Sequence, residues 1–179
     1  MQIVDTITEW LGVKAMPSIL HPPYEGDVVI LDVPSYSQTD EYSCGAIAAW
    51  SIVETFYPKV DFWKFYTTVN PDPDEGIGPR GIVSALRKFK IGTHARRRLK
   101  WEDIKEIIDD GCPMLVGTGR EIFEFGDHWN VLYGYGKRPD RVFLGNVPGL
   151  LRNQEVMSFK KFSREWNPCG EAIVCWGYE

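Results

Sequence analysis

Three side chains of the sequence have the types and the spacing that thiol chemistry needs: Gln38, Cys44 and His128. Cys44 follows Ser43, a residue type that often caps the start of a helix, and opens the most apolar segment of the chain. A cysteine attacks a carbonyl carbon as the thiolate, and both the positive end of a helix dipole and a nearby imidazolium stabilise that anion. The alternative for a single cysteine is a buried structural side chain, so its neighbours decide between the two.

His128 and Gln38 supply the other groups that such a reaction uses. His128 begins the strand-like segment HWNVLYGYG, where an imidazole can act as a general base and form an ion pair with the thiolate. Gln38 lies six residues before Cys44, and its amide can donate to an oxyanion together with the Cys44 backbone N–H. The structural alternatives are a half-buried strand histidine and an ordinary loop glutamine. The other histidines, His21 and His94, lie in a proline-rich segment and among basic residues.

Asn146 is the candidate for a third residue, which would orient the imidazole and stabilise its charged form. It ends the strand that is predicted to follow the His128 strand, in phase to face His128 across the hairpin. Asn130 and Asp127 are sequence neighbours of His128, and either can take this role instead. The residues alone leave this third position open.

The elements that must position these residues follow from hydrophobic periodicity. Apolar residues on nearly every face predict a central helix from Cys44 to Tyr57, ended by Pro58. Periodicity also predicts helices over residues 79–89, 101–110 and 158–166, and strands over 28–33, 114–118, 129–135, 142–146 and 172–178. Helices that precede a run of strands indicate an α+β domain, with helices on one side of a mainly antiparallel sheet.

The predicted organisation is one catalytic domain with a short N-terminal addition. Residues 1–26 are predicted to hold an amphipathic helix over 3–11 and a proline-rich connector. Residues 27–179 form the predicted domain. A length of 179 residues with 44% hydrophobic residues fits a single packed core.

Charge is distributed unevenly along the chain. The net charge of −5 argues against a dedicated nucleic-acid binder. Residues 87–100, here called the basic segment, carry seven basic and no acidic side chains, so the rest of the chain carries −12. Arg96, Arg97 and Arg98 in this segment are candidates for docking an acidic partner. The alternative is a solvated strand edge, where such charges deter pairing with another sheet.

Several classes of protein and site are excluded by the remaining residues. The four cysteines form no CxxC pair, which argues against a disulfide scaffold and a structural zinc site, and Cys112, Cys169 and Cys175 are interpreted as structural. The acidic stretch PDPDEG does not have the spacing of a calcium loop. We therefore expect no metal and no cofactor. The sequence shows no signal peptide and no long apolar run, which predicts a cytoplasmic protein without a membrane partner.

Seven motifs taken together resemble the papain-like cysteine peptidases, and most closely the C39-type, bacteriocin-processing branch. They span roughly residues 30 to 178 and are VPSYSQ, SCGAIAAW, GIGPRGIVSALRKF, WEDIKEIIDDGCPMLVG, DHWNVLYGYG, VFLGNVPG and MSFKKFSREW. The resemblance implies a papain-like fold, with Cys44 as nucleophile, His128 as general base and Gln38 at the oxyanion hole. It also implies a preference for small residues, such as a double glycine, before the scissile bond.

The chain departs from that branch in two ways. The branch usually has Asp-Pro after the second strand, where this chain has Asn146, Val147 and Pro148. An asparagine in the third role is common in the wider papain clan, whereas a shift of one residue would turn the side chain to the other strand face. The transporter domains that often accompany such peptidases are absent, so we expect a stand-alone catalytic unit.

The predicted function is that of a thiol hydrolase, which cleaves a peptide or isopeptide bond of a peptide or protein substrate through a Cys44 acyl-enzyme. One alternative is an acyltransferase of the transglutaminase type, in which an amine takes the acyl group from the same thioester. The other is a pseudoenzyme that binds a peptide in the cleft without cutting it.

Overall fold

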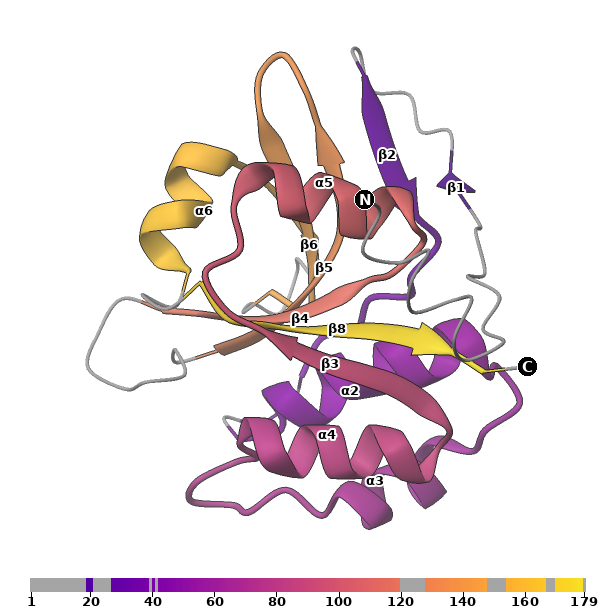
Figure 1. Ribbon diagram of the computed structural model, residues 1–179. Helices are drawn as coiled ribbons and strands as arrows, with labels where there is room; N and C mark the ends of the chain where they lie inside the picture. Colours follow the sequence, from indigo (N-terminus) through magenta and orange to yellow (C-terminus); the bar gives the residue numbers. More distant parts are fainter. Residues whose placement is uncertain are drawn as a thin grey trace.

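The computed structural model describes residues 19–20, 27–38, 40, 42–119, 128–147, 154–166 and 170–178, which Figure 1 shows as coloured ribbon. The described helices are α2 (Cys44–Phe56), α3 (Phe62–Val69), α4 (Pro79–Lys88), α5 (Trp101–Asp109) and α6 (Phe159–Glu165). The described strands are β1 (Ile19–Leu20), β2 (Val28–Leu31), β3 (Ile91–Arg96), β4 (Met114–Thr118), β5 (His128–Gly136), β6 (Arg141–Gly145), β7 (Gln154–Ser158) and β8 (Ala172–Gly177).

The described strands form one antiparallel sheet in the order β1-β2-β5-β4-β8-β3, with β6 on β5 and β7 on β6. β5 is the centre of this sheet. It pairs with β4 from His128 to Leu132 and with β2 from Gly134 to Gly136. β6 overlaps both stretches and therefore takes the opposite edge of β5. The strand that begins with His128 is thus held on both sides.

α2 is the helix around which the other helices pack. Its residues from Gly45 to Val53 are all buried, as expected of a helix that is apolar on nearly every face. Figure 1 shows α2, α3 and α4 on one side of β3, β4 and β8, and α5 on the other side. The prediction of an α+β domain with a central helix on an antiparallel sheet is confirmed. The helices were expected on one side of the sheet and instead lie on both, because α5 packs on β5 and β2.

Gly45 sets the distance between α2 and its neighbours. A Cβ atom at this position would lie 2.6 Å from Cγ2 of Ile77 and 3.0 Å from Cδ1 of Trp129. Both distances are shorter than an ordinary carbon contact of about 3.5 Å. Only glycine therefore lets the first turn of α2 approach both the segment that leads into α4 and the start of β5.

The predicted elements agree with the described ones to within two residues at most boundaries, and α3, β3 and β7 were not anticipated. α3 carries its own boundary signals, since the Asp61 carboxylate accepts the Lys64 N–H and Asn70 ends the helix in the left-handed conformation. β3 is an edge strand that spans residues 91–96, the middle of the basic segment, whereas Arg87 and Lys88 belong to α4. The helix predicted over 3–11 lies outside the described residues, and Ile19–Leu20 of the predicted connector pairs with β2.

Gly45→Ala should lower the free energy of unfolding by about 1–3 kcal/mol, although alanine favours helices, because the new methyl group meets Ile77 and Trp129. Urea unfolding of Gly45→Ala, Ile77→Ala and the double variant measures this. We expect the two losses to be less than additive, since truncating Ile77 makes room for the methyl group. Strictly additive losses would contradict the contact.

Candidate active site

Cys44 is the first residue of α2, and the turn before it is closed by a carboxylate. Asp40 Oδ1 accepts the backbone N–H groups of Tyr42 and Ser43 at 3.0 and 2.7 Å. Ser43 occupies the predicted N-cap position, but its side chain makes no capping hydrogen bond. Asp40 therefore does the work of orienting the chain into the helix, a role that sequence reasoning missed although a carboxylate just before a helix is a known signal.

The Cys44 sulfur is half-buried and lies against backbone N–H groups from two elements. Burial raises the pKa of the Cys44 thiol above its usual value, and the negative charge of Asp40 adds to this increase. The backbone N–H groups of Trp129, Gly45 and Cys44 itself donate to the sulfur and offset part of it. Because Trp129 follows His128 in β5, its contact with the sulfur brings the predicted nucleophile and the start of the His128 strand together.

His128 is the first residue of β5 and pairs with Thr118 of β4. Its Nε2 forms a hydrogen bond with the backbone carbonyl of Asn146. A carbonyl only accepts, so Nε2 carries the proton, and Nδ1 of the neutral ring is left with the lone pair that a general base needs. Burial lowers the pKa of the His128 imidazole from its usual value, and the bond to the Asn146 carbonyl opposes this decrease.

Asn146 touches every segment of the site. Its side-chain Nδ2 donates to the backbone carbonyls of Cys44 at 2.9 Å and Trp129 at 2.8 Å, and its backbone N–H donates to Ser35 Oγ at 3.0 Å. The residue is 1% exposed and has a φ of 57°, a left-handed conformation that asparagine tolerates better than most residues. The side chain was expected to face His128, and instead the backbone carbonyl does so.

Gln38 is attached to the same turn that leads into α2. Its Nε2 donates to the Asp40 carbonyl at 2.6 Å, and its Oε1 is buried without a partner among the described residues. An amide nitrogen carries two hydrogens, so one remains for a second acceptor. The structure therefore links Gln38 to Cys44 through Asp40, whose carboxylate in turn holds the Ser43 N–H.

The alternative candidates have other partners. The Asn130 side chain donates to Thr118 Oγ1 at 2.5 Å, within the sheet, and Asp127 lies outside the described residues. Cys112 and Cys175 are buried, and burial raises the pKa of both thiols, that of Cys112 to about 12. They are therefore poor nucleophiles at neutral pH. Cys169 lies outside the described residues.

Two further features concern metals and membranes. Among the residues that the structure describes, no three His, Cys, Asp or Glu side chains gather as a metal site would need. The Asp72 carboxylate of the acidic stretch instead accepts the N–H groups of Asp74 and Glu75, which closes a turn. None of the described helices has both the length and the apolar character required to cross a membrane.

Known proteins share both sequence and fold with this chain. Residues 30–174 match the family described as Peptidase C39 like, whereas no curated protein matches the sequence. The peptidase domain of Streptococcus ComA, a bifunctional ABC transporter of a quorum-sensing pathway, superposes with a TM-score of 0.63 at 20% identity, over 80% of this chain and 97% of that one. A double-glycine motif protease from an AMS/PCAT transporter, in complex with its leader peptide, gives 0.65 at 14% identity, over 90% and 99%.

A plant enzyme extends this similarity of fold. The ragweed pollen cysteine protease Amb a 11, in its proform, superposes with a TM-score of 0.52 at 10% identity, over 98% of this chain and 74% of that one. The family match covers most of the chain, from the residue before the end of β2 into β8. The chain therefore belongs to the peptidase C39-like family and is a cysteine peptidase with a papain-like α+β fold.

Proposed function

We propose that the chain is a thiol hydrolase that cleaves a peptide or isopeptide bond through an acyl-enzyme on Cys44, with His128 as general base. The observation that carries this proposal is the pair of hydrogen bonds from Asn146 Nδ2 to the backbone carbonyls of Cys44 at 2.9 Å and of Trp129 at 2.8 Å, the residue next to His128. It supports the pairing of a thiol at a helix start with an imidazole at a strand start, which is the arrangement that nucleophilic catalysis by cysteine requires.

The proposed mechanism has two stages. His128 Nδ1 accepts the Cys44 proton as the sulfur attacks the substrate carbonyl carbon, and the resulting oxyanion accepts hydrogen bonds from the Cys44 backbone N–H and the Gln38 amide. The imidazolium then gives its proton to the departing amine, which leaves an acyl group on sulfur. In the second stage His128 deprotonates a water molecule that attacks the thioester, and the product acid leaves as the thiol is restored.

The pKa directions support a neutral resting state for this pair. Burial raises the pKa of the Cys44 thiol and lowers the pKa of the His128 imidazole, so each group favours its neutral form. The sequence predicted a resting thiolate–imidazolium pair. We propose instead that the pair rests as thiol and imidazole, and that the proton moves when the substrate carbonyl is in place.

Asn146 acts in this proposal as a positioning residue with two separate roles. Its carbonyl keeps the proton of His128 on Nε2, and its amide group ties the backbone of Cys44 to that of Trp129. Only the second role depends on the side chain, and it needs a donor. An aspartate, which the related branch usually has after this strand, would place an acceptor against two carbonyl oxygens.

We propose a polypeptide substrate with small residues before the scissile bond. The support is the neighbour that is a double-glycine motif protease solved with its leader peptide, which has the same fold over 90% of this chain. A groove of the size that a peptide needs is also present, and it shares four lining residues with a pocket lined by Trp129.

His128→Ala should lower kcat/KM by about 10²–10⁴-fold, the range that a general base contributes. In the wild type, activity should fall on the acid side with a pKa below about 6.5, because burial keeps His128 neutral to lower pH and only the neutral ring can accept the thiol proton. Release of aminomethylcoumarin from a peptide that ends in Gly-Gly measures both. His94→Ala, which removes an exposed histidine of β3, is the matched control. An acid limb above 6.5, or an equal loss in the control, would oppose the assignment.

Alkylation of Cys44 by iodoacetamide tests the resting state. We expect the rate to keep rising above pH 8.5, because a raised pKa preserves the unreactive thiol to higher pH. A rate plateau that extends below pH 7 and disappears in His128→Ala would show a resting ion pair instead.

Asn146→Asp should lower activity, although the related branch usually has an aspartate after this strand. We expect a fall in kcat of about 10–100-fold and a loss of about 1–3 kcal/mol of stability, because two buried carbonyls lose their donor. The new carboxylate near His128 should also move the acid limb to higher pH, which a purely structural change would not do. Asn130→Asp, at an equally buried asparagine, should lower stability and leave the pH profile unchanged. A kcat for Asn146→Asp equal to that of the wild type would refute the positioning role of the Asn146 side chain.

Partition of the acyl-enzyme separates hydrolysis from acyl transfer. With glycinamide added at millimolar concentration, we expect the free acid to remain the main product when products are separated by mass spectrometry. A dominant amide product would identify an acyltransferase, and the absence of any acyl-enzyme on Cys44 would identify a pseudoenzyme.

A further inference from the structure

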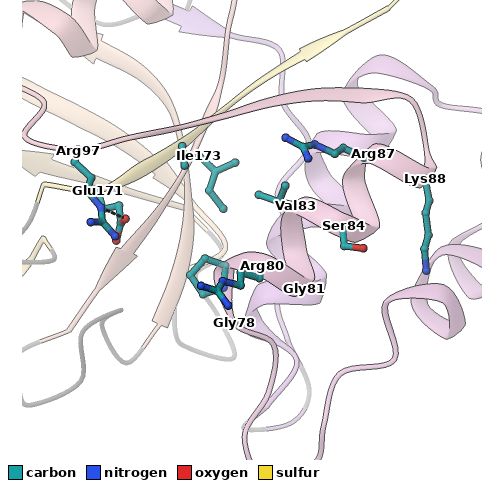
Figure 2. A pocket seen from close by; sticks show the side chains of 12 residues that line it. Gly78, Arg80, Gly81, Val83, Ser84, Arg87, Lys88, Arg97, Glu171 and Ile173 are labelled. Carbon is teal, nitrogen blue, oxygen red and sulfur yellow. Dashed lines mark hydrogen bonds and ion pairs between the residues drawn. The ribbon is translucent and has the colours of Figure 1, made fainter.

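A groove of about 1020 Å³ lies between α4 and the strands β3 and β8. Figure 2 shows Arg80, Val83, Ser84 and Arg87 of α4 on one side, and on the other Ile173 of β8 with Arg97 and Glu171, which flank β3 and β8. Val83, Ala95 and Ile173 give the groove an apolar floor. Polar groups occupy its rims. The groove can therefore contact both the apolar and the polar side chains of a bound peptide.

The rims of this groove are basic. Of the described residues that line it, Arg80, Arg87, Lys88 and Arg97 are basic and Glu171 alone is acidic. Glu171 accepts a hydrogen bond from Arg97 Nε at 2.6 Å. Arg87 donates through Nε to Thr93 Oγ1 at 3.2 Å, which fixes the direction of its guanidinium. Within the described part of its lining, four cations face one carboxylate on a chain with a net charge of −5, which favours an anionic ligand here.

The groove shares lining residues with a pocket near the candidate active site. This smaller pocket has Pro79, Ala95, Glu171 and Ile173 in common with the groove and is also lined by Gly117, Trp129 and Ala172. The Trp129 carbonyl accepts a hydrogen bond from Asn146 Nδ2, which also donates to the Cys44 carbonyl. The residues that line this pocket therefore link the groove to the start of the helix that carries Cys44.

We propose that this groove binds an acidic segment of the polypeptide substrate in an extended conformation, a proposal that rests on the proposed peptidase function. α4 has ten residues and is therefore about 15 Å long. An extended peptide advances about 3.3 Å per residue, so the helix accommodates four or five residues. Alternate carboxylates of such a segment meet the arginine rims, where guanidinium groups bind carboxylates in pairs of hydrogen bonds, and the apolar side chains between them meet the floor.

The groove identifies which basic residues are placed to contact an acidic ligand. Of Arg96, Arg97 and Arg98, the three predicted to dock an acidic partner, only Arg97 lines it. Arg80 lies seven residues before the basic segment and lines it as well. These residues come together because α4 packs against β3 and carries its arginines toward that edge strand.

Binding of two fluorescein-labelled peptides to the Cys44→Ala protein tests this proposal without any chemistry. The acidic probe is Glu-Leu-Glu-Leu-Glu-Gly-Gly, and the matched probe has glutamine in place of each glutamate. Fluorescence anisotropy should give a Kd at least about tenfold lower for the acidic probe at low salt, with the difference shrinking as ionic strength rises toward 0.5 M. Equal Kd values for the two probes would overturn the proposal.

Charge reversal locates the site. Arg80→Glu together with Arg87→Glu should weaken binding of the acidic probe about tenfold or more and leave the glutamine probe unchanged. Arg80→Glu alone is the second variant, because Arg80 is exposed in the first turn of α4, where a glutamate suits the helix. Lys160→Glu with Arg164→Glu on α6 makes the same change of charge on a helix distant from α4 in Figure 1 and should have no effect. Unchanged binding in both groove variants, or an equal loss in the α6 variant, would refute the site.

Two further arms separate this proposal from its rivals. A fluorescein-labelled oligothymidylate of seven nucleotides should bind no more tightly than the glutamine probe, and tight binding that the groove variants abolish would replace the peptide with nucleic acid as the occupant. Failure of the proposed peptidase function gives a different result. An unreactive Cys44 in the wild type would refute that function, but it would not alter the Kd values measured with the Cys44→Ala protein. Equal Kd values for the acidic and glutamine probes, together with a reactive Cys44 in the wild type, would refute only the proposed binding of an acidic segment in the groove.

Discussion

One side-chain amide joins the two halves of this active site. Asn146 Nδ2 donates to a carbonyl at the start of α2 and to a carbonyl at the start of β5, and the proposed nucleophile and the proposed base lie at those two starts. Both carbonyls are shielded from water by a residue that is itself 1% exposed, so the two hydrogen bonds are made where an unpaired acceptor would be costly. These two hydrogen bonds therefore fix the backbone of Cys44 relative to the backbone at the start of β5, from which the thiol and the imidazole extend.

The surrounding fold makes this arrangement rigid. β5 is paired on both edges, so the strand that carries His128 has little freedom to move within the sheet. α2 is apolar on nearly every face and is buried against β5, α3 and α4, which fixes the helix that carries Cys44. The backbone of Asn146 then supplies the last connection, to Ser35 on one side and to His128 on the other. A site of this kind is prepared before substrate arrives, which is the condition for electrostatic stabilisation at low reorganisation cost.

The sequence predicts the parts of this site whose signals are local. The apolar run after Cys44 predicts α2, and the alternation after His128 predicts β5, because burial imposes those periods on neighbouring residues. The role of the Asn146 backbone was beyond such reasoning, since it depends on a φ of 57° rather than on a residue type. The same holds for Asp40, which caps the turn through two backbone N–H groups, and for the groove, whose Arg80 and Arg97 meet only after α4 packs on β3. α3 was missed because its signals are single capping residues at its two ends.

Gly45 links recognition to chemistry in a way that limits how this enzyme can change. The missing side chain lets both Ile77, which leads into α4, and Trp129 of β5 approach the first turn of α2, the helix that carries Cys44. α4 forms one wall of the groove and α2 carries the Cys44 thiol. The close approach of Ile77 to Gly45 therefore fixes the positions of both helices relative to each other. A new α4 grafted from a relative, with a bulkier or smaller residue in place of Ile77, would shift the groove and the sulfur together. Substrate preference and the position of the thiol consequently cannot be changed independently by exchanging α4 as a whole. An altered preference must come from substitutions along α4 that keep the contact between Ile77 and Gly45.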